Sequence, residues 1–340
     1  MSQATVTIPE GYKSPLSLLE TEVAIKQVKD FFESNLSKNL NLTRISAPLF
    51  VKPETGLNDN LNGVESAVNF TAKDVGTSKL EIVHSLAKWK RMALHRYKFS
   101  SGSGLYADMN AIRKDEDLSN LHSIYVDQWD WERIIDREQR NKDFLKEIVQ
   151  KLYSTFKDTE TFVSEKVNSA IKPTLPEKIH FLTTKELELE FPDLDAKGRE
   201  HAICKKHGAV FLMEIGHLLP KSGIKHDGRA PDYDDWELNG DILFWYPLLD
   251  RSIELSSMGI RVSAESLKSQ LDIANANDRL ELDYHKNIID GTLPFTIGGG
   301  IGQSRICMFF LKKAHIGEVQ STLWDENTLK VCAEAGVDLL

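Results

Sequence analysis

The chain has 340 residues, of which 41% are hydrophobic and 27% are charged, and this is the range of globular proteins that bury a sizeable core. Its formal charge of −9, from 42 basic and 51 acidic residues, argues against a broad basic surface for nucleic acid. Three cysteines without CxxC spacing predict neither a zinc site nor a disulfide framework and are typical of a reducing compartment.

The N-terminal residues show no basic segment followed by an apolar one, and no apolar run reaches the length of a membrane span. We therefore expect a cytoplasmic protein without a membrane partner. The sequence also has no repeats and no long linker rich in Pro, Gly or Ser. We expect residues 1–340 to form a single domain.

The first predicted elements are a helix and a strand. Residues 16–36 favour an amphipathic helix, because apolar residues such as Val28 and Phe32 recur at helical spacing. A strand is predicted over residues 43–52, with Pro48 inside it. Proline leaves one position of a β-ladder unpaired, which indicates a sheet edge or an interface.

The remaining elements follow in chain order. Strands are predicted over residues 79–86, 104–113, 122–131, 178–182, 209–215, 240–247 and 252–259. Helices are predicted from residue 88 onwards and over residues 137–165, 194–206, 264–273, 279–289 and 303–312. Strands joined by short loops, with helices set apart, are typical of an α+β fold with a largely antiparallel sheet.

The stretch TIGGGIGQSR, residues 296–305, places four glycines in five positions. Clustered glycines let backbone approach a phosphate closely. The dinucleotide-binding pattern G-x-G-x-x-G fails, because Gln303 or Arg305 stands where its third glycine belongs. The Walker pattern is absent too. On these residues alone, a glycine-rich turn entering a buried helix is an equal alternative to a phosphate site.

Other polar segments fall at predicted strand ends. Arg113 closes one strand, and Gln128 and Asp130 alternate along the next one, so they share a face. Lys90 lies among three cations, with Lys88 and Arg91, at the start of a helix. Positive charge is unfavourable at a helix N-terminus and would suit an anionic ligand there.

Two acidic segments complete the set. Five aspartates occupy fifteen positions that end at Asp241, and Glu254 lies with serines in an otherwise apolar strand. Carboxylates on neighbouring strands are hard oxygen ligands of the kind that Mg²⁺ takes. Each segment alone is compatible with a salt-bridged surface, but all of them together with the glycine stretch predict a functional site.

These motifs resemble known families. RKDED after a strand and GGGIGQSR before a helix resemble motifs 2 and 3 of class II aminoacyl-tRNA synthetases, and the first helix with ISAPLFV resembles their motif 1. The chain is similar along nearly its whole length to the ammonia-dependent (type A) asparagine synthetases, which are aspartate–ammonia ligases. The matching runs are HSLAKWKR, LHSIYVDQWDWE, PDLDAKGRE, RAPDYDDW, ELSSMGIRV and IGGGIGQSR. One departure is a loop after Trp236 that is shorter than in bacterial members, which bears on how the site is covered.

The resemblance implies a class II synthetase-like catalytic core, a mainly antiparallel sheet flanked by helices, and a homodimer built on motif 1. It implies that ATP activates L-aspartate as β-aspartyl-AMP with release of pyrophosphate, and that ammonia then displaces AMP to give L-asparagine. Mg²⁺ would accompany ATP, and nucleic acid would not be a partner. Ser2 is not a nucleophilic cysteine and no segment is left for a glutaminase domain, so we expect free ammonia as the nitrogen donor.

The resemblance also assigns roles to residues, although Asp59 by itself is typical of a turn. Catalytic roles fall on Arg113, Arg305, Lys90 and Asp59, with Asp59 at the ammonia site. ATP would contact Arg113, Ser123, Val126, Glu254, Gly302 and Arg305, and Mg²⁺ would bind Asp241 and Glu254. Aspartate would contact Ser85, Gln128, Asp130, Tyr233, Asp234, Ser257 and Arg261.

Two alternatives are weighed against this interpretation. An aminoacyl-tRNA synthetase paralogue would use the same adenylation chemistry, but the acidic charge and the lack of an anticodon-binding extension disfavour it. A non-catalytic amino-acid or nucleotide sensor on the same fold would tend to lose a motif arginine or an acidic metal ligand. Here Arg113, Arg305, Asp241 and Glu254 are all present.

Overall fold

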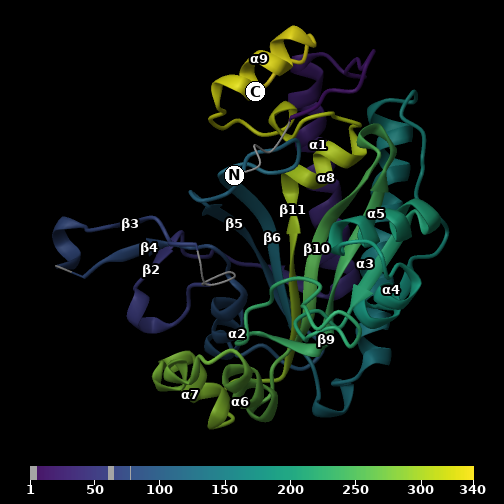
Figure 1. The fold of residues 1–340 in the computed structure, drawn as a ribbon. Helices are drawn as coiled ribbons and strands as arrows, with labels where there is room; N and C mark the ends of the chain where they lie inside the picture. The colour runs from purple at the N-terminus through teal and green to yellow at the C-terminus, as the bar shows by residue number, and fades with distance from the viewer. Residues whose placement is uncertain (1–5, 60–64, 77) are drawn as a thin grey trace.

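The protein is described from a computed structural model that covers residues 6–59, 65–76 and 78–340 (Figure 1). An eight-stranded sheet runs in the order β1-β5-β6-β11-β10-β9-β8-β7. Its inner pairs are antiparallel, whereas β1–β5 and β7–β8 at the two edges are parallel. The predicted α+β fold with a mainly antiparallel sheet is therefore confirmed. The strands are β1 (Leu42–Arg44), β5 (Gly104–Ile112), β6 (Tyr125–Ile134), β7 (His180–Thr183), β8 (Ala209–Met213), β9 (Asp234–Tyr246), β10 (Arg251–Arg261) and β11 (Thr296–Gly302).

Three helices pack on one face of this sheet: α1 (Leu18–Leu40), α3 (Lys142–Phe162) and α8 (Gln303–Phe310). In the core between them, the ring of Phe32 stacks on Trp129 with centroids 4.9 Å apart. Apolar rows at helical spacing on α1 and α3 account for this packing. The main hydrophobic core therefore lies on this side of the sheet, whereas smaller apolar clusters with α2 (Ala87–Arg96) and α5 (Ala196–His207) cover only part of the opposite side.

The helices begin at residues that favour helix starts. Ser17 and Glu20 form a capping box at α1, and the Asn141 side chain accepts from the Phe144 backbone at α3. None of the helices among the described residues is long and apolar enough to cross a membrane. The other α-helices are α4 (Thr184–Glu190), α6 (Ala264–Ile273), α7 (Asp283–Ile289) and α9 (Glu326–Glu334).

A small second sheet corrects the prediction of one strand over residues 43–52. That segment divides into β1 of the main sheet and β2 (Phe50–Val51), and Pro48 lies in the break between them. β2 pairs with β4 (Leu80–Ile82), and β4 pairs with β3 (Asn69–Phe70). Figure 1 shows this sheet projecting to the left of the main one. Pro48 thus lies in the segment that separates two strands rather than within an edge strand.

The glycine stretch is a strand and not a turn. β11 lies between β6 and β10 in the main sheet, and none of its glycines has a positive φ. Their missing side chains instead leave room for neighbours. A Cβ on Gly298 would lie 2.0 Å from Oε2 of Glu132, and one on Gly300 would lie 2.5 Å from Oε1 of Gln128. Gly298 and Gly300 are therefore explained by polar side chains from β6 that cross this strand.

Candidate active site

A cavity of about 330 Å³ opens on the face of the main sheet opposite α1, α3 and α8. Alternation along β6 produces this arrangement, because Trp129 and Trp131 enter the core while Gln128 and Asp130, which alternate with them, line the cavity. The cavity brings together nearly all the predicted residues: Asp59, Ser85, Lys90, Arg113, Ser123, Val126, Gln128, Asp130, Tyr233, Asp234, Glu254, Ser257, Arg261, Gly302 and Arg305.

A β-bulge in β10 decides which of its side chains face the cavity. Its pairing with β9 shifts register between Glu254 and Ser256. Leu255 enters the core on one side of the shift, and Met258 enters it on the other. The extra residue therefore lets Glu254 and Ser257 both line the cavity, although strict alternation would send them to opposite faces.

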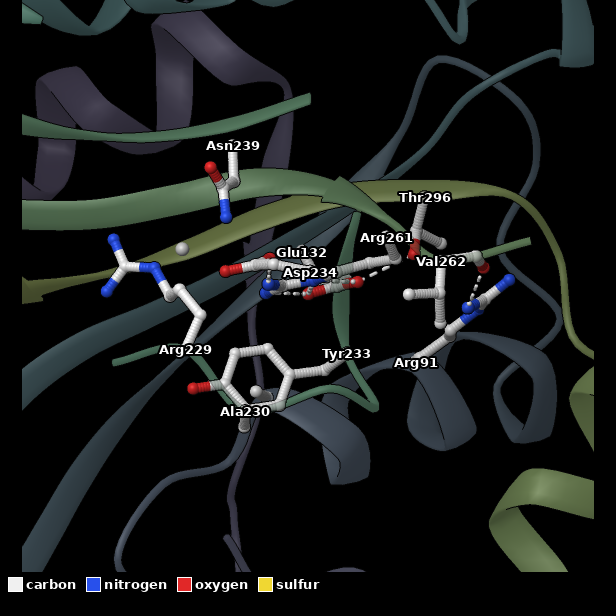
Figure 2. Close-up of polar contacts among 12 residues, drawn as sticks. Arg91, Glu132, Arg229, Ala230, Tyr233, Asp234, Asn239, Arg261, Val262 and Thr296 are labelled. Atoms are coloured by element: carbon white, nitrogen blue, oxygen red, sulfur yellow. Dashed lines mark hydrogen bonds and ion pairs between the residues drawn. The ribbon is translucent and has the colours of Figure 1, made fainter. Parts of the chain in front are cut away.

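At one end of the cavity, a buried guanidinium is held by two carboxylates (Figure 2). Arg261, 2% exposed, donates through Nε and Nη2 to the Glu132 carboxylate, with a shortest distance of 2.7 Å, and pairs through Nη1 with Asp234. Glu132 also accepts a 2.6 Å hydrogen bond from Thr296 Oγ1. Burial raises the pKa of Glu132, but Arg261 and the hydrogen bonds outweigh burial and hold that pKa below its ordinary value. Both groups stay charged.

Glu132 is a residue that the sequence analysis missed. It lies four residues after Gln128 and two after Asp130 on β6, so alternation alone places it on the same face. That pattern could have identified it. Its position beneath Arg261 makes it part of the site's charge balance.

Lys90 also points into the cavity wall. Its Nζ pairs with Asp130, donates to the Gly299 carbonyl at 3.0 Å and lies 3.9 Å from Glu132 Oε2. Burial lowers the pKa of Lys90, and the two carboxylates oppose that shift. The other two cations at the start of α2, which are expected to suit an anionic ligand, do not line the cavity. Lys88 pairs with Asp232 at 3.2 Å, and Arg91 donates to the carbonyls of Pro294 and Val262 at 2.9 Å each.

Asp59 lies inside the cavity wall rather than on an exposed turn, although residues 60–63 of its GLNDNLNG motif lie outside the described residues. It is 3% exposed, and the Tyr233 hydroxyl donates to its Oδ2 at 3.2 Å. Burial and Asp59 raise the pKa of Tyr233 well above its ordinary value, so the phenol remains a hydrogen-bond donor. The Arg261 guanidinium lies 5.7 Å from the Tyr233 ring centroid.

At the other end, Arg113 and Arg305 line the cavity with Glu254. Arg305 Nη1 donates to the Glu254 carbonyl at 3.0 Å and lies 4.0 Å from its carboxylate. Burial raises the pKa of Glu254, but Arg305 and neighbouring cations outweigh it and hold that pKa below its ordinary value. His122, missed in the sequence analysis, also lines this end, and burial and Arg305 lower its pKa to about 3. The imidazole is therefore neutral.

Asp241 is the predicted residue that the structure does not place on the cavity wall. Its carboxylate pairs with Arg229, which does line the cavity and which the sequence analysis missed. Burial raises the pKa of Asp241 to about 7. Among the described residues no three His, Cys, Asp or Glu side chains group as a metal site. Of the two residues predicted to bind Mg²⁺, Glu254 is the one whose side chain lines the cavity. Its carboxylate fits a Mg²⁺ ion that arrives with nucleotide phosphates, because this ion often binds one or two carboxylates and phosphate oxygens.

The helix that carries Arg305 is capped from another element. Gly302, its N-cap, has no side chain, so Asp127 of β6 accepts from the Ser304 backbone N–H at 3.0 Å and from its hydroxyl at 2.9 Å. Lys29 of α1 pairs with the same carboxylate at 3.0 Å. Gln320 donates to the Ser304 hydroxyl at 3.0 Å. Three distant segments thus fix the start of α8.

The shortened loop after Trp236 is not a loop in the structure, because β9 runs unbroken from Asp234 to Tyr246. It begins six residues earlier than the strand predicted over residues 240–247. The segment between β8 and β9 covers the cavity instead, and its residues Arg229 and Ala230 line the cavity.

Solved structures show where this fold occurs. The asparaginyl-tRNA synthetase of Entamoeba histolytica, in complex with asparaginyl-adenylate, matches with a TM-score of 0.65 at 11% identity, over 89% of this chain and 66% of that one. The enzyme of Pyrococcus horikoshii, also complexed with asparaginyl-adenylate, gives 0.63 at 14% identity, over 88% and 68%. This chain spans about two thirds of each synthetase. The predicted class II aminoacyl-tRNA synthetase-like core is confirmed.

Relatives in sequence match end to end. The aspartate–ammonia ligase of Clostridium perfringens strain 13 is 62% identical over 333 residues, 98% of each chain. That of Fusobacterium nucleatum is 60% identical over 330 residues, 97% of this chain and 100% of its own. The family model described as aspartate-ammonia ligase matches residues 19–336. The chain therefore belongs to the aspartate–ammonia ligase family.

Proposed function

We propose that this protein is an ATP-dependent ligase that makes L-asparagine from L-aspartate and ammonia through a β-aspartyl-AMP intermediate. The observation that carries the proposal is the full-length similarity to aspartate–ammonia ligases, together with a cavity that sets carboxylates and fixed cations side by side. Aspartate and ATP need both kinds of charge. The class II fold supports the adenylate, because two synthetases of this fold hold asparaginyl-adenylate.

The end of the cavity around Arg261 would bind aspartate. Arg261 suits a substrate carboxylate, because its guanidinium stays charged and is held rigidly by Glu132. Asp130 suits the α-ammonium, since its buried Oδ2 has no hydrogen-bond partner in the structure. Lys90, beside Asp130, would lower the repulsion between the attacking carboxylate and the α-phosphate. The remaining pocket residues would supply neutral hydrogen bonds: Ser85, Gln128, Tyr233 and Ser257.

The end around Arg113 and Arg305 would bind ATP. Two guanidinium groups that line the cavity before the reaction would stabilise the charge that spreads over phosphate oxygens during attack. Ser123 and Val126 would meet the adenine edge through backbone groups, and Gly302 would let the nucleotide approach α8. Glu254, joined by Asp241 when that carboxylate is available, would hold Mg²⁺. The ion, when bound, supplies positive charge at the phosphates.

The second step requires ammonia at the acyl carbon. Ammonium has no lone pair with which to attack, so a group in the site must hold it and accept a proton. Asp59, buried and hydrogen-bonded by Tyr233, fits this role. Gln128, which also lines the cavity, would orient the carbonyl.

We also propose a domain organisation, a cellular location and an oligomeric state. We infer one domain, because the main sheet takes strands from residue 42 to residue 302. Three free cysteines support a cytoplasmic location. Exposed Phe50 and Phe70 on the small sheet, at 45% and 37%, support a homodimer interface there.

Product analysis tests the function. The protein is mixed with ATP, Mg²⁺, aspartate and ammonium, and asparagine, AMP and pyrophosphate should form in equal amounts. Glutamine in place of ammonium should give little product. Aminoacylation of any tRNA would favour the synthetase alternative, and nucleotide binding without turnover would favour the sensor.

A further inference from the structure

The Arg229–Asp241 ion pair joins a loop to the centre of the main sheet. Arg229 lies in the segment between β8 and β9, and Asp241 lies within β9, where β8 and β10 flank it. The side chains are 12% and 7% exposed. The guanidinium lines the cavity and the carboxylate does not. A group approaching from the cavity therefore meets Arg229 before it meets Asp241.

Arg229 has hydrogen-bonding capacity left over. One N–H of the guanidinium is used by Asp241, while its Nε is buried and has no partner. Figure 2 shows the guanidinium pointing away from the Arg261 cluster. A buried N–H without an acceptor is unfavourable. A phosphate oxygen in the cavity would satisfy it, and guanidinium groups bind phosphate through paired hydrogen bonds.

The two carboxylates proposed for Mg²⁺ differ in availability. Glu254 lines the cavity beside Arg305, whereas the Asp241 carboxylate is held by Arg229. A divalent cation and a guanidinium at the same carboxylate oxygen repel each other strongly at short range. Arg229 pairs with Oδ1 of Asp241, so metal binding through that oxygen requires that Arg229 move away.

Arg229 is the partner that can move. Its segment, residues 214–233, has no β-ladder beyond an isolated bridge between Leu218 and Lys225. Leu218 and Ile224 are 63% exposed, although Ala230, next to Arg229, is buried. Asp241 is fixed by ladder pairing on both sides. A side chain on a loop outside the sheet can be displaced at lower free energy than a residue of a central strand.

We propose that Arg229 and a divalent cation are alternative partners of Asp241. Metal binding at Asp241 and Glu254 releases Arg229, and the freed guanidinium binds a phosphate oxygen of the nucleotide. The inference rests on the proposed ATP- and Mg²⁺-dependent reaction and explains why metal and nucleotide would strengthen each other's binding. Arg229 thereby acts in the site without being a metal ligand.

Mg²⁺ titration in the absence of nucleotide tests the competition. Calorimetry at pH 9.0 keeps Asp241 ionised, which matters because burial raises the pKa of this carboxyl to about 7. Arg229→Gln should bind Mg²⁺ about tenfold or more tighter than wild type, since contacting charges couple by this order. The gain should vanish when Asp241→Asn is added. Wild-type or weaker affinity in Arg229→Gln would overturn the proposal.

Matched variants guard against an unspecific effect. Arg140 and Asp235 form a 2.8 Å ion pair with side chains 12% and 10% exposed, so Arg140→Gln breaks a pair of equal burial and should leave Mg²⁺ affinity unchanged. A tenfold gain in this control would also overturn the proposal. Arg229→Lys keeps the buried charge balanced and protects the fold. It should gain in the same direction but less, because lysine lacks the guanidinium fork.

The nucleotide supplies a second readout. Mg²⁺ should tighten binding of a non-hydrolysable ATP analogue to wild type, and Arg229→Gln should lose most of that tightening. Neither measurement needs turnover. If wild type fails to exchange pyrophosphate with ATP, the proposed function fails, and if it exchanges but the Arg229 variants bind Mg²⁺ like wild type, only the competition fails.

Discussion

At the scale of single residues, Arg113 and Arg305 place positive charge at the end of the cavity proposed to bind ATP. Arg113 follows β5, and its Nε is buried without a partner, whereas Arg305 is the third residue of α8. We expect Arg305→Ala or Arg113→Ala to lower kcat by roughly 10²-fold or more, because one fixed transition-state contact is lost. Pyrophosphate exchange and steady-state rates would measure it. Arg44→Ala removes an arginine from an exposed pair with Asp108 and serves as the control. Wild-type turnover in a site variant would remove that arginine from the mechanism.

Asp59 separates the two half-reactions. Asp59→Asn keeps the shape of the side chain but cannot accept the ammonium proton. We expect the variant to exchange pyrophosphate with aspartate and to form little asparagine. At fixed total ammonium, wild-type activity should rise with pH as more ammonia becomes available. Equal loss of both half-reactions in the variant would show that Asp59 serves the first step or the fold.

Sequence patterns identify some of the site residues but not others. Glu132 could have been identified, because alternation along β6 places it beside Gln128 and Asp130. Lys88 resembles Lys90 in the sequence, but only the fold shows that Asp232 neutralises it. Arg229 likewise becomes a site residue only through a loop whose path no local pattern specifies.

At the scale of elements, α8 depends on a cap from β6. Asp127→Ala should destabilise the fold by about 1 kcal/mol, which is typical of a lost cap, and should raise the KM for ATP because Arg305 follows Ser304 directly. Asp127→Asn retains an acceptor for the Ser304 N–H and should restore much of that KM. Thermal unfolding and ATP kinetics would measure both. A change in stability without a change in KM would mean that the cap does not position Arg305.

The burial of His315 should make the stability of the fold sensitive to acid. Its ring is fully buried and accepts a 3.1 Å hydrogen bond from the Gly317 N–H, and burial lowers its pKa to about 4. An unfolded histidine titrates near about 6.5, so between these values the unfolded chain binds a proton that the folded chain does not. Stability should therefore fall as pH drops from about 6.5 to about 4, by at most roughly 3 kcal/mol from this group.

His315→Asn places a neutral acceptor near the same N–H. Its melting temperature should fall less than that of wild type between pH 6.5 and 4.5, and thermal scans at several pH values would show the difference. Parallel curves for the two proteins would assign the acid sensitivity to other groups, among them His122.

The elements show where local sequence suffices. The helix over residues 264–273 is predicted with the bounds of α6. Its apolar residues recur at helical spacing, and its cap, Ser263, directly precedes it in the sequence. For the glycine stretch, the sequence leaves a turn and a phosphate site as equal alternatives, and in the structure these residues form β11. Gly298 and Gly300 make room for side chains from β6, which local sequence does not reveal. Pro48 misleads similarly, since proline excludes ladder pairing but does not tell a break from an edge.

At the scale of the whole molecule, the small sheet presents an apolar surface. Phe50 and Phe70 contact edge to face with centroids 5.2 Å apart, and the neighbouring Leu49 is 49% exposed. We expect a symmetric homodimer that buries this surface, and Phe50→Asp should shift sedimentation toward the monomer. Leu329→Asp, on α9 and 49% exposed, is the control and should not. A wild-type protein that stays an active monomer at micromolar concentration would contradict the dimer.

The strand order of the main sheet has a consequence for biosynthesis. β11, made from residues 296–302, joins β1, β5 and β6 on one side to β10, β9, β8 and β7 on the other. A growing chain in which synthesis has not yet reached residue 296 therefore holds two separate half-sheets, each with an unpaired edge. Such edges pair readily with other chains, and contacts distant in sequence form slowly. The cavity floor comes into existence only when nearly nine tenths of the polypeptide has been synthesised, so the time before closure is when aggregation threatens it most.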